Sequence, residues 1–279
     1  MTLRKPTLPP GWHPQDPDEI VRFLSAFSGV AGFGRGWKPG RAVVAPHAGW
    51  LYSGKIAAKA IARLDKKAET VAIAGGHLPN GRRPLFAMED FAETPLGKMP
   101  MDRDLRAAMI AETSGWEDDL PDNTVESLLP MARFFFPDAS LLWTRFPDDL
   151  ASFEAGKTLA VVASRLGRSL VVVASADLTH YGRRYGFAPM GEGLEALRWV
   201  SEVNDRRLIA AVESGDPRAV LRSAREDKTT CAAGAILAAM GFAQATGAGP
   251  ARLIDYGTSA DLEKVFRGGS FVSYAAFAF

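Results

Sequence analysis

Short apolar runs alternate along the chain with segments of helical periodicity. Four apolar runs have the length and composition of buried strands, at residues 41–46, 70–74, 141–144 and 170–174. Two more strands are predicted later in the chain, at residues 251–256 and 270–279. Apolar residues that recur every three or four positions predict helices at residues 18–27, 54–64, 101–113, 149–166, 193–214 and 231–246. Strands buried on both faces read as continuous apolar runs, so the pattern predicts an α/β fold, in which parallel strands of a central sheet are flanked by helices.

The segments between these elements are less regular. Residues 1–17 are rich in proline and predict an extended N-terminal arm, whereas the glycine-rich residues 29–40 predict a loop. Residues 80–100 show no clear period and predict either a hairpin or an active-site loop. The chain contains no repeat and no linker long enough to divide it. The sequence therefore predicts a single α/β domain over residues 1–279.

Composition narrows the classes of function. The formal net charge is +1, and the chain has no basic run, so we expect neither nucleic acid nor an acidic membrane surface as a partner. Cys231 is the only cysteine, which excludes an intramolecular disulfide. The first residues lack the apolar core of a secretory signal, and no stretch approaches the ~20 apolar residues of a membrane helix. We expect a cytoplasmic protein.

Three of the four histidines lie where α/β proteins bind ligands. His13 lies in the proline-rich leader, and we expect it to be a surface residue. His47, His77 and His180 each follow an apolar run, and ligands bind at the carboxyl ends of strands in open α/β sheets. Neutral imidazole is the commonest metal ligand, so several strand-end histidines together favour a metal site. A structural histidine in a turn is the alternative for each of them.

The residues around these histidines add to the chemistry. Ser53 is a candidate N-cap for the helix that follows His47. The pair Gly75-Gly76, directly before His77, indicates a backbone that passes close to another group. Asp177 lies three residues before His180, so one helical turn would place both side chains on the same side. The alternative for Asp177 is a turn or helix-capping aspartate.

Cys231 opens an alanine-rich helix. A thiol at the start of a helix is expected to have a lowered pKa, because it feels the positive end of the helix dipole, and thiolate is the form that binds metal. A single cysteine beside alanines is also typical of a small buried apolar residue. The residues alone leave both interpretations open.

The order of these motifs resembles the Memo family, also called the B component of the Ammecr1–Memo–radical-SAM gene set. Residues 46–54 (PHAGWLYSG) resemble its opening signature, and residues 73–77 occupy the place of its Leu-Gly-Pro-Ser-His. Residues 94–97 with Asp102 and residues 175–182 (SADLTHYG) follow in the family's order. The single late cysteine and the C-terminal strand motifs at residues 256–259 and 274–275 complete the match.

The resemblance implies a fold related to class III extradiol dioxygenases. It also implies a pocket in which two histidines and one cysteine hold one iron or copper ion. Carried over by motif, these ligands are His47, His77 and Cys231. Asp177 and His180 match the remaining polar residues of that pocket, where they are candidate catalytic residues.

The chain departs from the family pattern at three places. Many members have Glu-His-Ser-x-Glu where this chain has residues 122–126 (DNTVE), so any function of that histidine is missing here. The helix-capping roles that we predict for Asn123 and Glu126 are compatible with the change. Gly75-Gly76 replaces Pro-Ser, and Ala232 replaces the glycine that normally follows the cysteine. None of these changes removes a predicted ligand.

Three kinds of function remain open. The first is an iron- or copper-dependent oxidative activity, although a thiolate ligand departs from the facial 2-His-1-carboxylate pattern of oxygenases and favours softer metals. The second is a metal-independent module that binds a small molecule or a peptide; animal members are linked to phosphotyrosine peptides. The third, suggested by the gene set, is a partner of radical-SAM and Ammecr1-type proteins.

Overall fold

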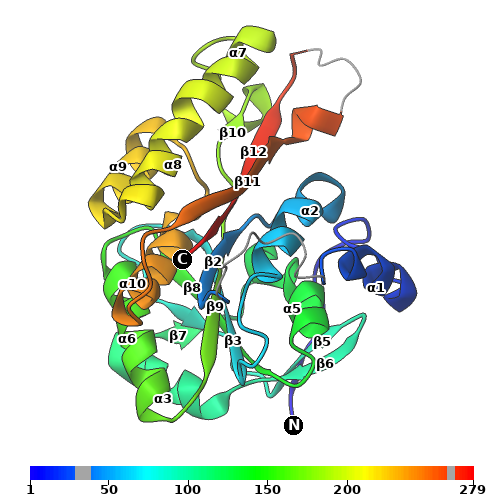
Figure 1. The fold of residues 1–279 in the computed structure, drawn as a ribbon, viewed down its shortest axis with the longest axis vertical. Helices are drawn as coiled ribbons and strands as arrows, with labels where there is room; N and C mark the ends of the chain where they lie inside the picture. The colour runs from blue at the N-terminus through cyan, green and yellow to red at the C-terminus, as the bar shows by residue number, and fades with distance from the viewer. Residues whose placement is uncertain (29–38, 263–267) are drawn as a thin grey trace.

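Four parallel strands form the middle of a mixed sheet (Figure 1). We describe the protein from a computed structural model, which covers residues 1–28, 39–262 and 268–279. The central strands are β2 (Ala42–Ala45), β9 (Leu170–Ser175), β3 (Thr70–Leu78) and β8 (Ser140–Pro147), and they lie side by side in this order. All four were predicted from their apolar runs, and the predicted α/β class with parallel central strands is confirmed.

Antiparallel strands extend the sheet on both sides. β12 (Phe271–Ala278) lies antiparallel to β2 and also pairs with β11 (Arg252–Thr258) and with β10 (His180–Tyr181). At the other edge, β4 (Leu85–Phe86) runs antiparallel to β8. The short β7 (Trp116–Glu117) lies outside β4. The late strands were predicted from the sequence, but their antiparallel direction was not.

Both faces of the central strands are buried. Along β2, Ala42 and Val44 pack into one apolar cluster, and Val43 and Ala45 pack into the other. This alternation follows from the two-residue period of a strand, and it explains the continuous apolar runs. The first cluster includes side chains of α10 (Ala233–Ala245), α6 (Ala151–Arg165) and α3 (Arg103–Thr113). The second includes side chains of α2 (Trp50–Ile61) and α5 (Leu129–Phe135).

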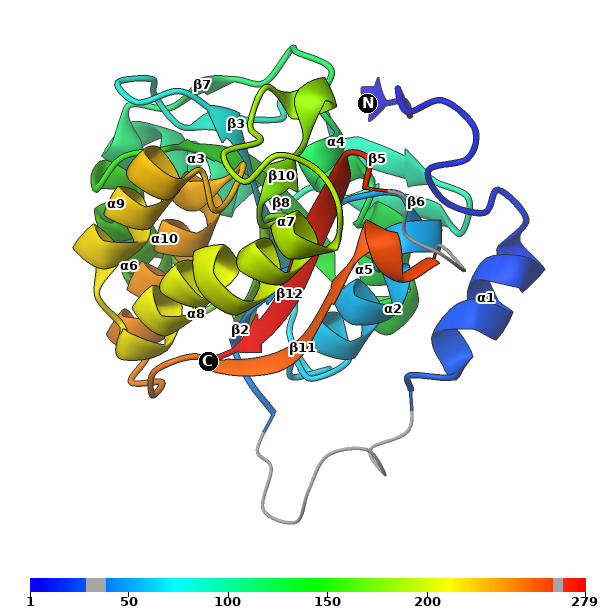
Figure 2. The same cartoon turned by 90° about the horizontal axis from the view of Figure 1, so that it is seen from above.

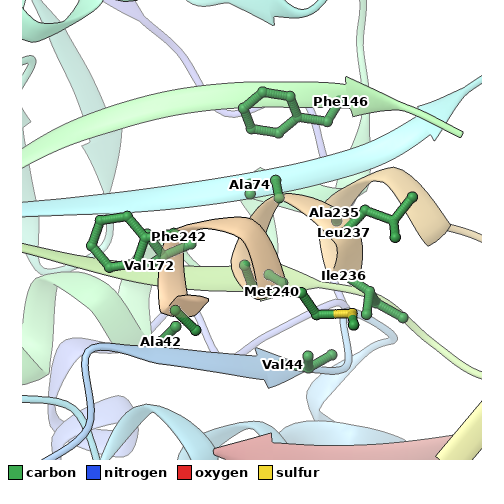
Figure 3. Close-up of a cluster of buried hydrophobic side chains, with 14 of the residues drawn as sticks. Ala42, Val44, Ala74, Phe146, Val172, Ala235, Ile236, Leu237, Met240 and Phe242 are labelled. Atoms are coloured by element: carbon green, nitrogen blue, oxygen red, sulfur yellow. The ribbon is translucent and has the colours of Figure 1, made fainter. Parts of the chain in front are cut away.

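Helix α10 lies directly on the sheet. Its side chains contact residues of β2, β3, β8 and β9, as Figure 3 shows around Ile236, Leu237 and Met240. Glycines allow its closest approach to α6, because a Cβ on Gly156 would lie 2.0 Å from the Ala238 carbonyl oxygen. The start of α10 lies against the carboxyl end of β8, because a Cβ on Gly234 would lie 2.3 Å from the Pro147 carbonyl oxygen.

The predicted helix at 193–214 is interrupted. It consists of α7 (Leu194–Trp199), a π-helical turn (Val200–Asn204) and α8 (Asp205–Ser214). The turn places Asn204 and Asp205 in a buried contact with Thr179, whose hydroxyl donates to the Asp205 carboxylate at 2.5 Å. Such bulges are frequent near functional sites and are invisible to a 3.6-residue pattern. Helix α9 (Pro217–Asp227) was not predicted.

The N-terminal residues lie against a separate small sheet. β1 (Leu3–Arg4) pairs with β5 (Phe91–Thr94), which forms a hairpin with β6 (Gly97–Pro100). Part of the segment 80–100 is therefore the predicted hairpin. Helix α1 (Pro17–Ser25) follows, and the side chain of Asp16 caps it. The predicted loop at 29–40 falls largely on residues 29–38, which lie outside the described residues.

Three local predictions were wrong. Helix α2 begins at Trp50, so Ser53 is not its N-cap and instead donates from its hydroxyl to the Ala48 carbonyl oxygen at 3.0 Å. Asp122, not Asn123, caps the short α4 (Asn123–Glu126). His13 is buried, with 8% exposure, and its ring lies beside that of Trp50. For Ser53 and His13 the deciding contacts are distant in sequence, between Trp50 and residues 12 and 13, whereas the cap by Asp122 is local.

No helix in the described part of the chain is both long enough and apolar enough to cross a membrane.

Candidate metal site

His47, His77 and Cys231 converge at the carboxyl edge of the central strands. His47 lies two residues beyond β2, and His77 is the penultimate residue of β3. Cys231 lies two residues before α10. One ligand atom from each of the three lies within 4.8 Å of the others. The Cys231 sulfur is 3.4 Å from Nε2 of His47, so the predicted convergence is confirmed.

The surroundings of His47 leave its Nε2 free. Nδ1 of His47 lies 3.1 Å from the Ser175 hydroxyl, which donates its only proton to the Thr124 carbonyl oxygen. The hydroxyl oxygen must therefore accept a hydrogen bond from Nδ1–H of His47. This fixes the tautomer in which Nε2 carries the lone pair. Burial lowers the pKa of His47, although the Asp177 carboxylate opposes the shift, so the ring is neutral near pH 7.

His77 is held by a carboxylate. Its Nδ1 lies 3.1 Å from Oδ2 of Asp122, which leaves Nε2 available as a ligand. Burial opposes ionisation of Asp122, but hydrogen bonds from His77 and Thr124 and the Arg145 guanidinium lower the pKa of this carboxyl to about 2. The backbone of His77 is left-handed, with φ of 57°, which is uncommon for a residue with a side chain.

Arg145 connects Asp122 to a second buried carboxylate. Its NH1 lies 3.1 Å from Oδ2 of Asp122, while Nε and NH2 donate to Asp118 at 3.0 and 2.9 Å. The Trp143 indole also donates to Asp118, at 2.9 Å. The oxygen of Asp122 that faces Nδ1 of His77 is therefore also held by a fixed guanidinium.

The pKa of the Cys231 thiol is shifted in the opposite direction to the one that we expected from the sequence. Burial raises the pKa of the thiol well above its usual range, and the nearby Asp177 carboxylate raises it further. The helix dipole does not compensate, because α10 begins two residues later, at Ala233. In the metal-free protein the side chain is a neutral thiol, and it must lose a proton to bind a metal.

Asp177 and His180 flank the same three residues. Oδ1 of Asp177 accepts hydrogen bonds from the backbone N–H groups of His47 (2.8 Å) and Ala48 (3.3 Å). Its Oδ2 lies 3.7 Å from Nε2 of His47 and 3.9 Å from Nε2 of His180, which is beyond hydrogen-bond distance. The two residues come together through an irregular turn into β10, and the predicted helical turn is absent.

His180 presents an unpartnered nitrogen to this group. Its Nε2 is buried and makes no hydrogen bond within the described residues. The ring packs edge-on against Tyr185, with centroids 5.0 Å apart. Burial lowers the pKa of His180 despite the Asp177 carboxylate, so this ring is also neutral near pH 7.

The glycine pair before His77 makes room for two neighbours. A Cβ on Gly75 would lie 2.2 Å from the Thr124 hydroxyl oxygen, and a Cβ on Gly76 would lie 2.3 Å from the Ala232 Cβ. Both distances are far below van der Waals contact. The prediction that the backbone passes close to another group here is confirmed.

Sequence reasoning missed the residues that orient the two histidines. Ser175 holds Nδ1 of His47, Asp122 holds Nδ1 of His77, and Thr124 contacts both holders. Ser175 was part of a quoted motif, and residues 122–126 were noted only as a departure from the family. Both segments had therefore been singled out in the sequence. Their roles remained hidden because the contacts span 45 to 128 residues of sequence.

The donor set fits a metal ion. Two tetrahedral ligands, a nitrogen at about 2.1 Å and a sulfur at about 2.3 Å from one ion, lie about 3.6 Å apart. The observed distance of 3.4 Å between the Cys231 sulfur and Nε2 of His47 is close to this value. Both imidazoles have Nδ1 engaged and Nε2 free, as metal-binding histidines require. These three side chains could hold one ion.

Fold and site together define an α/β protein with a candidate His-His-Cys metal group at the carboxyl edge of its parallel strands. The chain belongs to the Memo family: the family profile, described as Memo-like protein, matches residues 4–278. A MEMO1 family protein of Methanococcoides burtonii is 32% identical, over 78% of this chain and 80% of that protein. One from Thermococcus kodakarensis is 28% identical over 99% of both chains. A solved structure of an uncharacterized Escherichia coli K12 protein is similar with a TM-score of 0.46 and 12% identity, over 85% of this chain and 98% of that one.

Proposed function

We propose that this protein binds one iron or copper ion through Nε2 of His47, Nε2 of His77 and the thiolate of Cys231. The observation that carries the proposal is the 3.4 Å contact between Cys231 and His47, with the ligand atoms of all three residues within 4.8 Å of one another. Three protein ligands leave at least one coordination position open for a substrate. When bound, the ion would supply redox or Lewis-acid chemistry at that position.

The surrounding charges bear on the choice of ion. A thiolate ligand favours a soft ion such as Cu(I). The Asp177 carboxylate, however, is 3% exposed and lies beside Nε2 of His47. Fe(II) with one thiolate and this carboxylate has a net charge of zero, which suits a buried site. Both ions therefore remain candidates, and Asp177 favours the divalent one.

Asp177 and His180 are the proposed proton-handling residues. Oδ2 of Asp177 and Nε2 of His180 lie 3.9 Å apart, and neither makes a short hydrogen bond to the other. A group bound at the open position would therefore find a carboxylate and a neutral imidazole beside it. These are the groups that accept and donate protons in general acid–base chemistry.

Metal analysis tests this proposal. The protein should be purified without added metal and without oxygen, as wild type and as the Cys231→Ala, His47→Ala and His13→Gln variants. His13 is buried outside the site and serves as a matched control. We expect close to one ion per chain in wild type and His13→Gln, and loss of the ion in the other two. Wild type that binds neither Fe(II) nor Cu(I) better than micromolar at about pH 7.5 would overturn the proposal.

Ligand binding by the same purified protein, before and after removal of the metal, distinguishes the proposed function from the alternatives. A metal-independent binding module, or a partner of radical-SAM and Ammecr1-type proteins that needs no ion, would bind its ligand equally well after a chelator removes the metal. The proposed function requires that chelation abolish ligand binding or activity and that Fe(II) or Cu(I) restore it.

A further inference from the structure

Thr124 lies at the junction between the two histidine supports. The side chain is fully buried in α4, between β3 and β9. Its hydroxyl donates to Oδ1 of Asp122 and accepts a hydrogen bond from the backbone N–H of Gly76 at 3.2 Å. Its carbonyl oxygen accepts the hydrogen bond of Ser175. All of the polar groups that Thr124 offers on this side are therefore in use.

Each of these contacts leads to a candidate ligand in one step. Asp122, held by the Thr124 hydroxyl, lies 3.1 Å from Nδ1 of His77. Ser175, held by the Thr124 carbonyl oxygen, lies 3.1 Å from Nδ1 of His47. The hydrogen bond to Gly76 fixes the backbone next to His77, where φ is positive. One residue thus reaches the ring nitrogen of both histidines through a single intermediate on each side.

The strand beside Thr124 is shaped to admit it. A Cβ on Gly75 would lie 2.2 Å from the Thr124 hydroxyl oxygen, so any other residue there would displace it. β3 also changes its register against β8 between Gly75 and Leu78. The φ of Gly75 is not positive, so its backbone conformation does not itself require glycine. Glycine is needed here because the Thr124 hydroxyl approaches its Cα closely.

We propose that Thr124 is a positioning residue for both His47 and His77, fixing each ring as the Nδ1–H tautomer and directing both Nε2 atoms at one point. This inference rests on the proposed metal function, which it deepens. The competing explanation is purely structural: Thr124 would stabilise the short α4 and β3 without affecting the rings.

Metal-free protein offers a direct test. The ring nitrogens of His47 and His77 can be followed by ¹⁵N NMR in wild type, Thr124→Val and Thr124→Ser. We expect the Nδ1–H tautomer at both rings in wild type and Thr124→Ser. Thr124→Val keeps the shape, the backbone carbonyl and the N–H that donates to Asp122, but it loses the hydroxyl that fixes the rotation of this carboxylate. The carboxylate should then turn away from Nδ1 of His77 in part of the molecules, and His77 should become a mixture of tautomers. A single Nδ1–H tautomer at His77 in Thr124→Val would overturn the proposal.

Metal affinity gives the second measurement, with Co(II) alone as a spectroscopic probe and Fe(II) under anaerobic conditions. Thr124→Val should lower affinity roughly 10–100-fold and shift the thiolate-to-Co(II) absorption band, as the loss of an outer hydrogen bond does in metal sites. Thr124→Ser should stay within about threefold of wild type. Thr94→Val, which removes a buried hydroxyl from the β5–β6 hairpin, is the matched control and should leave affinity unchanged.

Thermal melting of each metal-free variant distinguishes a positioning role of Thr124 from a contribution to stability alone. A purely structural Thr124 predicts a lower melting temperature with wild-type affinity and spectrum, and that result would overturn the proposal. If Thr124→Val does not fold, Ser175→Ala breaks the other branch, and His47 should lose its fixed tautomer while His77 keeps it. If wild type binds no metal, the proposed function is overturned. If wild type binds metal and Thr124→Val binds it with the same affinity, only the role of Thr124 is overturned.

Discussion

The three candidate ligand side chains are not equally prepared for a metal. His47 and His77 each donate Nδ1–H to a neighbour and leave Nε2 as the nitrogen available to a metal. Cys231 is different, because burial and Asp177 keep its thiol protonated in the metal-free protein. Binding of a metal through Cys231 must therefore release the thiol proton.

This difference predicts a pH dependence of metal affinity. Below the raised pKa of Cys231, the thiolate fraction of the metal-free protein grows about tenfold per pH unit. Apparent Fe(II) affinity should therefore rise, by up to about tenfold per unit between roughly pH 6.5 and 8.5. Anaerobic titrations at several pH values would measure this slope. Cys231→Ser should bind more weakly with a shallower slope, and a wild-type affinity that is flat with pH would exclude the thiol as a ligand.

Asp177 predicts a change in the choice of metal. Asp177→Asn keeps an oxygen that can accept from the N–H groups of His47 and Ala48, but it removes the negative charge. Fe(II) affinity should fall roughly 10–100-fold, as for loss of a neighbouring charged group in a metal site. Cu(I) affinity should fall less, since a monovalent ion with one thiolate is already neutral. Competition titrations with both ions give the ratio, and equal losses would show that charge balance is not the role of Asp177.

The sequence predicted the candidate ligands but not what orients them. Strand-end placement pointed to His47 and His77, and the resemblance in motif order added Cys231. The supports at Asp122 and Ser175 depend on contacts across 45 and 128 residues, which no local pattern contains. The predicted direction of the Cys231 pKa shift was wrong for a related reason. The pKa of this thiol depends on burial by distant residues and not on the nearby helix.

At the scale of elements, prediction succeeded where burial is complete on both faces. β2, β3, β8 and β9 have the strongest signals because nearly all of their side chains are buried. Prediction was poorer where a single contact between distant residues decides at which residue an element begins. α2 begins at Trp50 because Gly49 and Trp50 lie against the backbone of Trp12, to whose carbonyl oxygen the Trp50 N–H donates at 2.7 Å.

Two departures from the family pattern compensate for each other. The family's serine before the second histidine is here Gly76, and its glycine after the cysteine is here Ala232. In the structure these positions face each other, and a Cβ on Gly76 would lie 2.3 Å from that of Ala232. The β-carbon that is missing on one side of the contact is present on the other.

A double-mutant cycle tests this compensation. Gly76→Ala alone should lower the free energy of unfolding by about 1–3 kcal/mol through overpacking. Adding Ala232→Gly should restore part of the loss, with a coupling of about 0.5–3 kcal/mol. Restoration should be incomplete, because the Ala232 Cα would still lie 2.8 Å from the new Cβ. Urea unfolding of the four proteins measures the coupling, and simple additivity would contradict the proposed contact.

At the scale of the whole molecule, the N-terminal residues tie together parts of the chain that carry the site. Figure 2 shows this blue segment running along the outside of the molecule to α1. Arg4 donates to the Asp118 carbonyl oxygen at 2.6 Å, and the Trp12 carbonyl oxygen accepts from Trp50, three residues after His47. Between them, Glu126 binds the segment from α4. The arm that the sequence predicted as merely extended therefore has specific contacts with the segment that follows His47 and with α4, which follows Asp122.

Glu126 is the strongest of these contacts and gives the last prediction. Its buried carboxylate accepts from the N–H groups of Thr7 (2.7 Å) and Leu8 (2.8 Å) and from the Thr7 hydroxyl (2.5 Å). Glu126→Gln replaces one accepting oxygen by a donor and removes the charge. The free energy of unfolding should fall by about 1.5–3 kcal/mol, as for hydrogen bonds to a charged group. Urea unfolding measures this loss, and trypsin should cleave after Arg4 faster than in wild type. Glu89→Gln, which loosens only the partly exposed ion pair with Arg4, is the control and should cost at most about 1 kcal/mol. Wild-type stability and cleavage in Glu126→Gln would mean that the N-terminal segment is held by its other contacts.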